Sequence, residues 1–369
     1  MAVAVQGKGF FIWKIPSCEG GNAQAIATQA QVAGLNFVVI KIADGTRPMN
    51  YDTARSVDLI PPVALALKAA GIQVWGWHYV YGYDPLGEAR KAIQRMQALN
   101  LDGYVIDAEA EYKQAGKDKA ARQYLAELRS AYPSLPIGLS SYRFPSYHKD
   151  FPWQAFLDGI DYHMPQVYWE QAHNAGTQLT RTVQEFQAMT PYRPVLPTGP
   201  GYKTGGWAPT EADTKEFLST ALSLGLPTVS FFSWDECRRD LPKIWTTIGD
   251  FNYQGAASTG QDVAGKLIDA LNQRNLDQAV SLYNPNAVQI TSSRTIQGQD
   301  AIKTWYASLL NQLPASTFTL TGLSGTGNSR HFTWQATSTR GAIHNGSDTL
   351  GLVDGKINYH YSFFTISPN

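Results

Sequence analysis

Three carboxylates at alternate positions end the apolar run Gly103–Glu111 and are the first candidates for chemistry. In a β-strand alternate side chains share a face, so Asp107, Glu109 and Glu111 are expected to point the same way. Same-face neighbours lie roughly 6.6 to 6.8 Å apart, and paired carboxylates in glycosidases lie roughly 5 to 9.5 Å apart. Because unpaired charge resists burial, the pattern favours a sugar-binding or sugar-cleaving site over a packed core.

Residues 1–250 alternate between apolar, β-branched runs and amphipathic stretches, which is typical of a parallel α/β fold. The eight runs expected as strands are Gly9–Ile15, Phe37–Ala43, Gln73–Tyr81, Gly103–Glu109, Ile137–Ser141, Tyr162–Trp169, Pro194–Thr198 and Thr228–Trp234. The stretches expected as helices are Asn22–Ala33, Val57–Ala70, Leu86–Leu99, Asp118–Ala131, Thr177–Met189 and Thr210–Leu224. The pattern predicts a (β/α)8 TIM barrel. A doubly wound sheet is the competing fold, but the first turn lacks the dinucleotide-binding glycines.

Polar and aromatic residues at the ends of the expected strands complete the candidate site, since a TIM barrel collects its strand ends at one face. The candidate substrate-binding residues are Lys41, Asp44, His78, Tyr79, Tyr142, Gln166, Tyr168, Trp169, Trp234 and Asp235. For His78 the competing interpretation is a structural histidine. For Asp107 and Glu109 it is an ion-pair group with Lys41 and Lys14.

Three stretches resemble the lysozyme-like family 25 glycoside hydrolases: Phe37–Gly45, Trp75–Tyr79 and Ile106–Glu109 are similar to that family's second, third and fourth strands. The resemblance implies that Glu109 is the general acid and that Asp107 assists it. Family 25 members carry an aspartate on the first strand, whereas Phe11–Ile15 holds no carboxylate. The barrel is therefore expected to be a divergent relative.

Two further stretches, Met164–Trp169 and Phe231–Asp235, look like the chitinase-type family 18. That resemblance implies that Tyr168 and Trp234 line a subsite for an N-acetylated sugar. A general acid must hold its proton near the working pH, so Glu109 is expected to be protonated. Asp107 is expected to stay ionised only if Lys41 or a tyrosine such as Tyr168 reaches it, and Glu111 is expected to be solvated.

A composition shift to small and polar residues marks 251–260 as a linker and 261–369 as a second domain. Helices are expected over 262–283 and Ala301–Leu313, followed by the strands Thr317–Leu323, Arg330–Thr339, Thr349–Val353 and Lys356–Ile366, which is an α+β order. The stretches Leu276–Val288 and Ile296–Ile302 resemble the SnoaL-like branch of the nuclear transport factor 2-like (NTF2-like) fold. The resemblance implies a conical pocket, with candidate linings Trp305, Tyr306, Trp334 and His344. It leaves enzyme, binder and homodimerisation roles open.

Composition argues against several partners. The chain has 30 basic and 30 acidic side chains and no basic run, so nucleic acid is not expected. No apolar run approaches the roughly 18 residues of a membrane span, and the N-terminus lacks a signal-peptide pattern. The compartment stays open, with extracellular function or release on lysis both compatible. Scattered histidines and the lack of Cys-x-x-Cys predict no metal and no cofactor.

Two functions remain open. The first is a glycoside hydrolase acting on an N-acetylated polysaccharide of the peptidoglycan or chitin type, by a substrate-assisted mechanism. The second is a non-catalytic carbohydrate-binding or assembly scaffold with a dimerising C-terminal domain. Cys18 and Cys237 follow the first and last expected barrel strands, so they are expected to be adjacent, and bonded if the protein works outside the cytosol.

Overall fold

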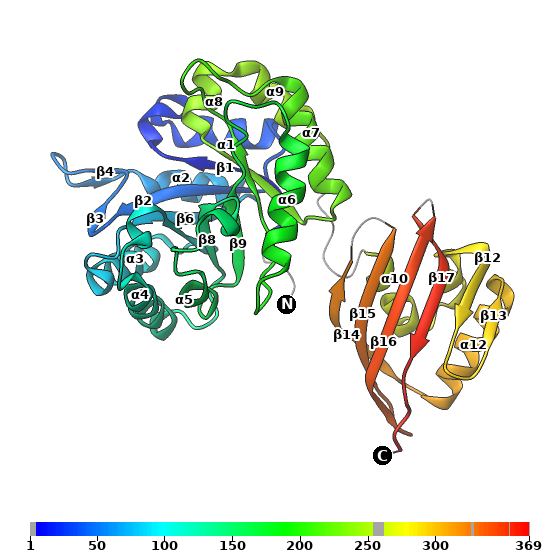
Figure 1. The fold of residues 1–369 in the computed structure, drawn as a ribbon. Helices are drawn as coiled ribbons and strands as arrows, with labels where there is room; N and C mark the ends of the chain where they lie inside the picture. Colours follow the sequence, from blue (N-terminus) through cyan, green and yellow to red (C-terminus); the bar gives the residue numbers. More distant parts are fainter. Residues whose placement is uncertain (1–4, 254–261, 326–327, 354, 369) are drawn as a thin grey trace. The chain divides into compact units, whose positions relative to one another are not determined.

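The computed structural model describes residues 5–253, 262–325, 328–353 and 355–368. They divide into two compact units, one within residues 3–255 and the other made mainly of residues 256–369 (Figure 1). Most of the predicted linker, 254–260, lies outside the described residues. Among the described residues, no helix combines the length and the apolar character needed to cross a membrane.

In the described part of the first unit, eight parallel strands close into a barrel, which confirms the predicted TIM-like fold. The closure comes from the first strand, which pairs with both the second and the last. The barrel strands are β1 Gly7–Ile12, β2 Phe37–Asp44, β6 Gln73–Val80, β7 Gly103–Ala108, β8 Ile137–Tyr142, β9 Tyr162–Gln166, β10 Thr198–Pro200 and β11 Thr228–Phe232. The predicted strand Pro194–Thr198 was placed too early in the sequence, because β10 begins only at Thr198.

Helices surround the barrel (Figure 1). They are α1 Ala23–Val32, α2 Ile60–Ala69, α3 Pro85–Leu99, α4 Lys117–Ala131, α5 Trp153–Leu157, α6 Ala175–Gln187, α7 Glu211–Ser223, α8 Trp234–Asp240 and α9 Pro242–Asp250. The short strands β3 Arg47–Pro48, β4 Tyr51–Asp52 and β5 Val57–Asp58 lie between β2 and α2. The predicted start of the second helix at Val57 was wrong, since Val57 pairs with Asp52 in a small hairpin. Pro61 and Pro62 suit the first turn of a helix, and α2 begins just before them.

Large apolar side chains fill the barrel, so it is a packed core and not a pore. Phe11, Trp75, Trp77, Val105 and Met164 form one buried cluster inside it. Side chains at alternate strand positions point inward and the others point to the helices. This alternation decides which of the predicted site residues can reach the mouth of the barrel.

Lys8 ties the first strand to the end of the last barrel helix. It is buried, and its Nζ donates to the carbonyl oxygens of Ile248, Gly249 and Phe251 at 2.7, 2.8 and 2.8 Å. Burial lowers the pKa of this ammonium to about 8. Carbonyls at the C-terminus of a helix lack partners within the helix, so Lys8 supplies the donors that α9 needs.

We expect Lys8→Met to destabilise the barrel by about 3 kcal/mol, because buried carbonyls would lose a charged donor. Amide hydrogen exchange should speed up in the last turn of α9, and the urea midpoint should fall. The exposed Lys149 gives the matched control, since Lys149→Met removes one charge without a buried partner. Equal stability of the two variants would contradict the role assigned to Lys8.

The two cysteines are buried and free. Their neighbours Glu19 and Arg238 form an ion pair at 2.7 Å, so the segments after β1 and β11 do meet as expected. The thiols nevertheless turn to carbonyls of their own segments, Cys18 Sγ to Lys14 at 3.5 Å and Cys237 Sγ to Leu241 at 3.9 Å. The two thiols are not joined in a disulfide.

The second unit packs helices against one face of a six-stranded sheet (Figure 1). Its elements are α10 Val263–Asn272, α11 Leu276–Ser281, β12 Tyr283–Ile290, β13 Thr295–Gln297, α12 Gln299–Gln312, β14 Thr317–Ser324, β15 Ser329–Thr337, β16 Ala342–Val353 and β17 Lys356–Phe363. The strand order is β13-β12-β17-β16-β15-β14. The predicted α+β order is confirmed, although β12 and β13 were not among the predicted strands and β16 was expected to begin only at Thr349.

Candidate active site

Asp107 sits in the mouth of the barrel because β7 is paired on both sides. Its register partners are Tyr79 on β6 and Ser140 on β8. Inward-facing residues at the same level of neighbouring strands form a layer, and here the layer is polar. Asp107 is only 8% exposed, so the surrounding protein, more than water, sets its charge.

Gln166 at the end of β9 joins the two predicted catalytic acids. Its Nε2 donates to Glu109 Oε1 at 2.8 Å, to Asp107 Oδ1 at 3.2 Å and to Ser140 Oγ at 3.3 Å. The carboxyl groups therefore share one amide and lie in direct contact. The structure brings together Asp107, Glu109 and Gln166, which the sequence had selected from two different strands.

The surroundings of Asp107 favour its protonated form. Burial and the charge of Glu109 raise the pKa of Asp107 well above its usual range, and a hydrogen bond with Glu109 adds to the effect. Asp107 was expected to be ionised only if Lys41 or a tyrosine such as Tyr168 reached it, and Lys41 pairs with Asp44 instead. Desolvation disfavours a carboxylate more strongly than the single ammonium of Lys41 stabilises it.

Glu111 does not continue the strand. β7 ends at Ala108, and residues Ala110–Lys113 form a 3₁₀ turn, so the three acids do not share a strand face. Glu111 is half-buried and accepts a hydrogen bond from the Tyr79 hydroxyl at 2.9 Å. The prediction of a solvated Glu111 was therefore wrong, because the turn folds its carboxylate back to β6.

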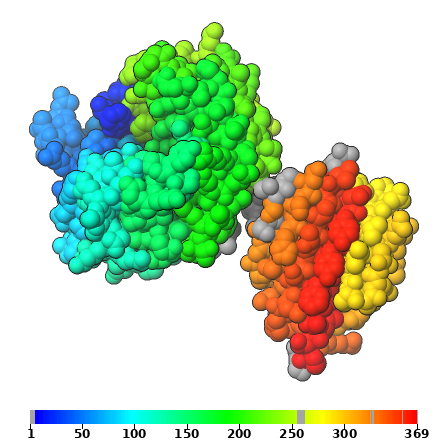
Figure 2. Space-filling model, in the orientation of Figure 1, coloured from blue at the N-terminus to red at the C-terminus, as the bar shows by residue number. Residues whose placement is uncertain are grey.

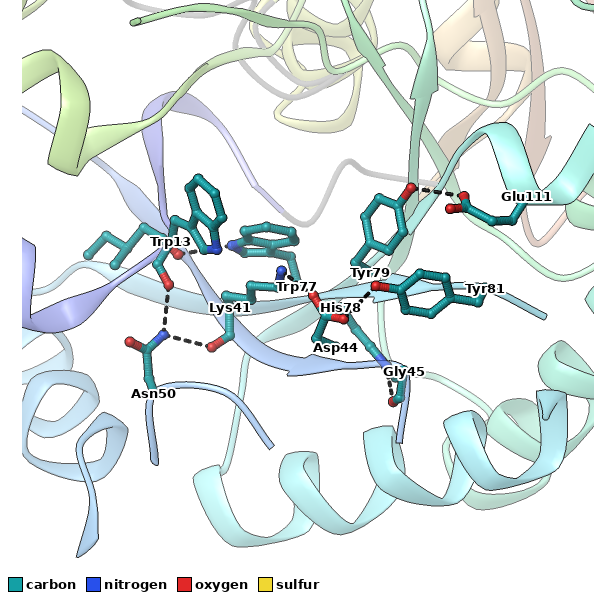
Figure 3. A network of polar contacts seen from close by, with 11 residues as sticks. Trp13, Lys41, Asp44, Gly45, Asn50, Trp77, His78, Tyr79, Tyr81 and Glu111 are labelled. Atoms are coloured by element: carbon teal, nitrogen blue, oxygen red, sulfur yellow. Dashed lines mark hydrogen bonds and ion pairs between the residues drawn. The ribbon is translucent and has the colours of Figure 1, made fainter. Parts of the chain in front are cut away.

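Lys41 and Asp44 form their own pair at the end of β2 (Figure 3). Lys41 Nζ lies 2.6 Å from Asp44 Oδ2 and 4.6 Å from the ring centroid of Trp77. Tyr81 donates from its hydroxyl to Asp44 Oδ1 at 2.8 Å. The Lys41 ammonium is therefore paired with the Asp44 carboxylate. In the described part of the chain, no salt bridge joins Asp107 or Glu109 to Lys41 or Lys14, although the charge of Lys41 partly offsets the rise in the pKa of Asp107.

Tyr142 and Tyr168 are half-buried rings beside the acids. Burial and the charges of Glu109 and Glu111 raise the pKa of Tyr142 to about 12. Burial and Tyr202 raise the pKa of Tyr168 well above its usual range, with further contributions from Asp107 and Glu109. Both hydroxyls therefore stay protonated at neutral pH and can donate hydrogen bonds.

Lys113 and His148 extend the mouth on the Tyr142 side. The Tyr142 ring stacks on His148 at 3.7 Å, and Lys113 Nζ lies 4.3 Å above the same ring. Lys113 Nζ is also 2.7 Å from His148 Nδ1. This group fixes the Tyr142 ring in one orientation.

Two predicted substrate-binding residues, His78 and Trp169, face away from the mouth. His78 is fully buried between its contacts with Tyr104 at 2.9 Å and the Gly45 carbonyl at 2.7 Å, and burial lowers its pKa to about 4. Trp169 packs on Phe217 of α7. These placements follow from strand alternation: Tyr79 and Gln166 point inward, so His78 must point to the helices.

Trp234 opens α8 instead of ending β11, and its ring packs between Phe10 and Trp245. The predicted sugar-binding indole is thus part of the buried core. Its neighbour Asp235 is buried beside β1, where Oδ1 accepts from the Trp13 backbone N–H at 3.4 Å. Asp235 therefore supports the chain at the end of the first strand.

Sequence reasoning missed Ser140 as the third acceptor of the Gln166 amide, although the pairing of parallel strands could have indicated it. Asp107 and Ser140 are register partners, and both strands had been predicted. In the described part of the chain, no group of three or more His, Cys, Asp or Glu residues could hold a metal ion.

The pocket of the second unit is almost filled. Trp305, Tyr306 and Trp334 line it as predicted, but the remaining cavity is about 10 Å³, close to the smallest space that holds one water. His344 does not line it. This residue is exposed on β16, because the neighbouring Ile343 takes the inward position.

A buried hydrogen-bonded chain borders this cavity. His360 contacts Tyr283 through Nδ1 at 2.7 Å and Asp348 through Nε2 at 2.8 Å. Ser362 donates to Asp348 at 2.9 Å, and the hydroxyls of Tyr283 and Tyr306 lie 2.8 Å apart. Each member has a partner, as buried polar groups require.

The family match lies in this second unit, and the solved structures named here each cover less than a third of the chain. Residues 264–360 match the family model described as a SnoaL-like domain. A proposed isomerase of the SnoaL-like family from Agrobacterium tumefaciens is 21% identical, with 28% of this chain and 94% of that chain covered and a TM-score of 0.25. A proposed ketosteroid isomerase from Kribbella flavida is 21% identical, with 29% and 78% covered and a TM-score of 0.25.

An NTF2-like protein of unknown function from Cytophaga hutchinsonii is 18% identical, with 29% of this chain and 90% of that chain covered and a TM-score of 0.25. Comparison with curated proteins finds no match. At these identities the solved structures carry no functional argument, and the barrel has no family assignment. The C-terminal unit is a SnoaL-like domain of the NTF2-like fold, and it follows a TIM-like barrel.

Proposed function

We propose that the barrel is a glycoside hydrolase acting on an N-acetylated polysaccharide of the peptidoglycan or chitin type. The observation that carries the proposal is the contact pair of Asp107 and Glu109, held by the Gln166 amide in the mouth of the barrel. A buried carboxyl group with a raised pKa beside a second carboxyl group is the arrangement that separates acid and base roles.

In the proposed mechanism the pair carries one proton in the resting state, on Asp107. When substrate binds, this proton passes through the hydrogen bond to Glu109, which then donates it to the glycosidic oxygen as the general acid. The leaving sugar departs with that proton. Asp107 is left as a carboxylate and accepts a hydrogen bond from the acetamido N–H of the substrate.

The acetamido carbonyl oxygen attacks the anomeric carbon as the glycosidic bond breaks, which gives a cyclic intermediate. The Glu109 carboxylate then takes a proton from a water molecule, and the resulting hydroxide opens the ring. The Tyr142 and Tyr168 hydroxyls beside the pair remain donors at neutral pH, because burial raises their pKa values. They can bind the sugar hydroxyls without competing for the catalytic proton.

A second candidate function is a non-catalytic, carbohydrate-binding scaffold that dimerises through its C-terminal unit. One observation favours it: the inward positions at the end of β1 carry Phe11 and Trp13, so no carboxylate faces the acid pair from that strand. Tyr359, Tyr361 and Phe363 are exposed on β17, the strand coloured red in Figure 2, and would supply a dimer surface.

The experiment that separates the two functions compares the release of sugar fragments with the binding of the protein to the polysaccharide. The full-length protein is incubated with purified peptidoglycan and with chitin, and both reducing ends in solution and protein bound to the solid are measured. The hydrolase predicts that reducing ends accumulate linearly with protein concentration. Binding without release on both substrates would reject the hydrolase and favour the scaffold, whose dimer would then be checked by light scattering.

A further inference from the structure

Three tyrosines at alternate positions run from the end of β6 into the loop before α3. Tyr79 bonds to Glu111 and Tyr81 bonds to Asp44, and Figure 3 shows their rings side by side. The centroids of Tyr79 and Tyr81 are 5.0 Å apart, and those of Tyr81 and Tyr83 are 6.2 Å apart with an interplanar angle of 15°. The rings form a row that starts beside the acid pair and leads outward.

Tyr83, the outermost ring, is exposed but held in place. Tyr83 is 66% exposed. Lys117 Nζ lies 3.8 Å from its ring centroid, and Gln114 Nε2 donates to its hydroxyl at 3.4 Å. Lys117 itself is only 6% exposed and donates to the Tyr81 carbonyl at 2.7 Å. Burying an ammonium group is costly, so the hydrogen bond of Lys117 holds the group in one position. The ammonium group in turn keeps the exposed Tyr83 ring in one orientation.

The loop that carries Tyr83 is also fixed. The buried Glu88 carboxylate accepts hydrogen bonds from the backbone N–H groups of Tyr81 and Gly82 at 3.1 and 3.0 Å. Gly82 has a φ of 64°, and a Cβ there would lie 2.8 Å from the Tyr112 ring, so the turn requires glycine. The exposed ring is therefore preorganised, which lowers the entropic cost of ligand binding.

We propose that Tyr83 is an outer sugar subsite, at which a polysaccharide that occupies the acid pair extends along Tyr79 and Tyr81. This inference rests on the proposed function. Aromatic faces suit the apolar faces of pyranose rings, and the row connects the site to the surface without a gap. One exposed ring is much too small for a protein partner, which needs roughly 800 Å² per side.

The test is the dependence of binding on chain length. Affinities of the full-length protein for an N-acetylglucosamine disaccharide and a hexasaccharide are measured by calorimetry. We expect Tyr83→Ala to weaken hexasaccharide binding by about tenfold and to leave disaccharide binding unchanged. Tyr83→Phe should bind both like the parent, because it keeps the ring. Tyr192→Ala is the matched control, since Tyr192 is an exposed tyrosine in the loop between α6 and β10.

Each outcome is informative. If Tyr83→Ala binds the hexasaccharide as tightly as the parent does, the subsite is refuted and the proposed function is untouched. If it weakens both ligands equally, Tyr83 acts through the packing of the loop and the inference is again refuted. If the parent binds neither ligand, the proposed substrate class fails and the subsite fails with it.

Discussion

Glu109→Gln is expected to abolish hydrolysis while leaving sugar binding nearly intact. The loss of general-acid assistance costs typically ~10²–10⁴-fold in rate. The amide oxygen of glutamine can still accept the bond that Gln166 donates to Glu109 at 2.8 Å, so the geometry of the mouth should persist. The release of reducing ends gives the rate, and calorimetric titration with the hexasaccharide gives the affinity.

Glu111→Gln is the matched control for this prediction. It makes the same chemical change two residues away, and its amide oxygen can still accept the Tyr79 hydroxyl proton. We expect its rate to stay within a few-fold of the parent rate, because Glu111 is not part of the contact pair. If Glu109→Gln cleaved substrate as fast as the parent, the general-acid assignment would be wrong, and the acids would have to be reinterpreted as a binding cluster.

Asp107→Asn is expected to inactivate the barrel and to stabilise it at the same time. The rate should fall by at least ~10²-fold, since the pair would lose both its stored proton and the carboxylate that orients the acetamido group. Stability should respond in the opposite direction. Burial raises the pKa of Asp107 well above the 3.8 of an exposed aspartate, so its charged form is disfavoured in the folded protein.

The sign of the pH dependence follows from proton binding. Between pH 3.8 and the raised pKa of Asp107, the folded state binds more protons at this site than the unfolded state does. The free energy of unfolding therefore falls as pH rises through this window and stays lower above it. Asparagine has no proton to lose, so the fall should be smaller in Asp107→Asn, and the variant should exceed the parent in stability at neutral pH.

Urea unfolding at a series of pH values measures this effect. Asp118→Asn serves as the control, because Asp118 is exposed on α4 and its removal should leave the pH profile of the parent. Parallel profiles for Asp107→Asn and the parent would show that Asp107 is ionised in the folded state. The proton relay proposed from Asp107 to Glu109 would then be excluded.

Much of the fold was determined by the sequence itself. Apolar runs such as Phe37–Ala43 and Ile137–Ser141 matched β2 and β8 closely, because a buried parallel strand needs a continuous apolar stretch. The strand register then followed from barrel closure, and it brought Asp107 level with Tyr79 and Ser140. Local pattern could therefore predict that Asp107 lies at the C-terminal end of a barrel strand, whereas its neighbours depend on the register.

The tertiary structure decided which neighbours each side chain has, and hence its charge and its direction. Asp107 and Glu109 are both acidic residues in the sequence, yet only packing places Asp107 in the buried layer, where burial raises its pKa. Lys41 was an equally good partner for Asp107 by strand position, but Asp44 lies closer and takes its charge. The sequence around Tyr83 did not indicate a binding residue, because the orientation of its ring depends on Lys117, 34 positions along the chain. Solvation and long-range contacts are properties of the folded chain, so local pattern cannot supply them.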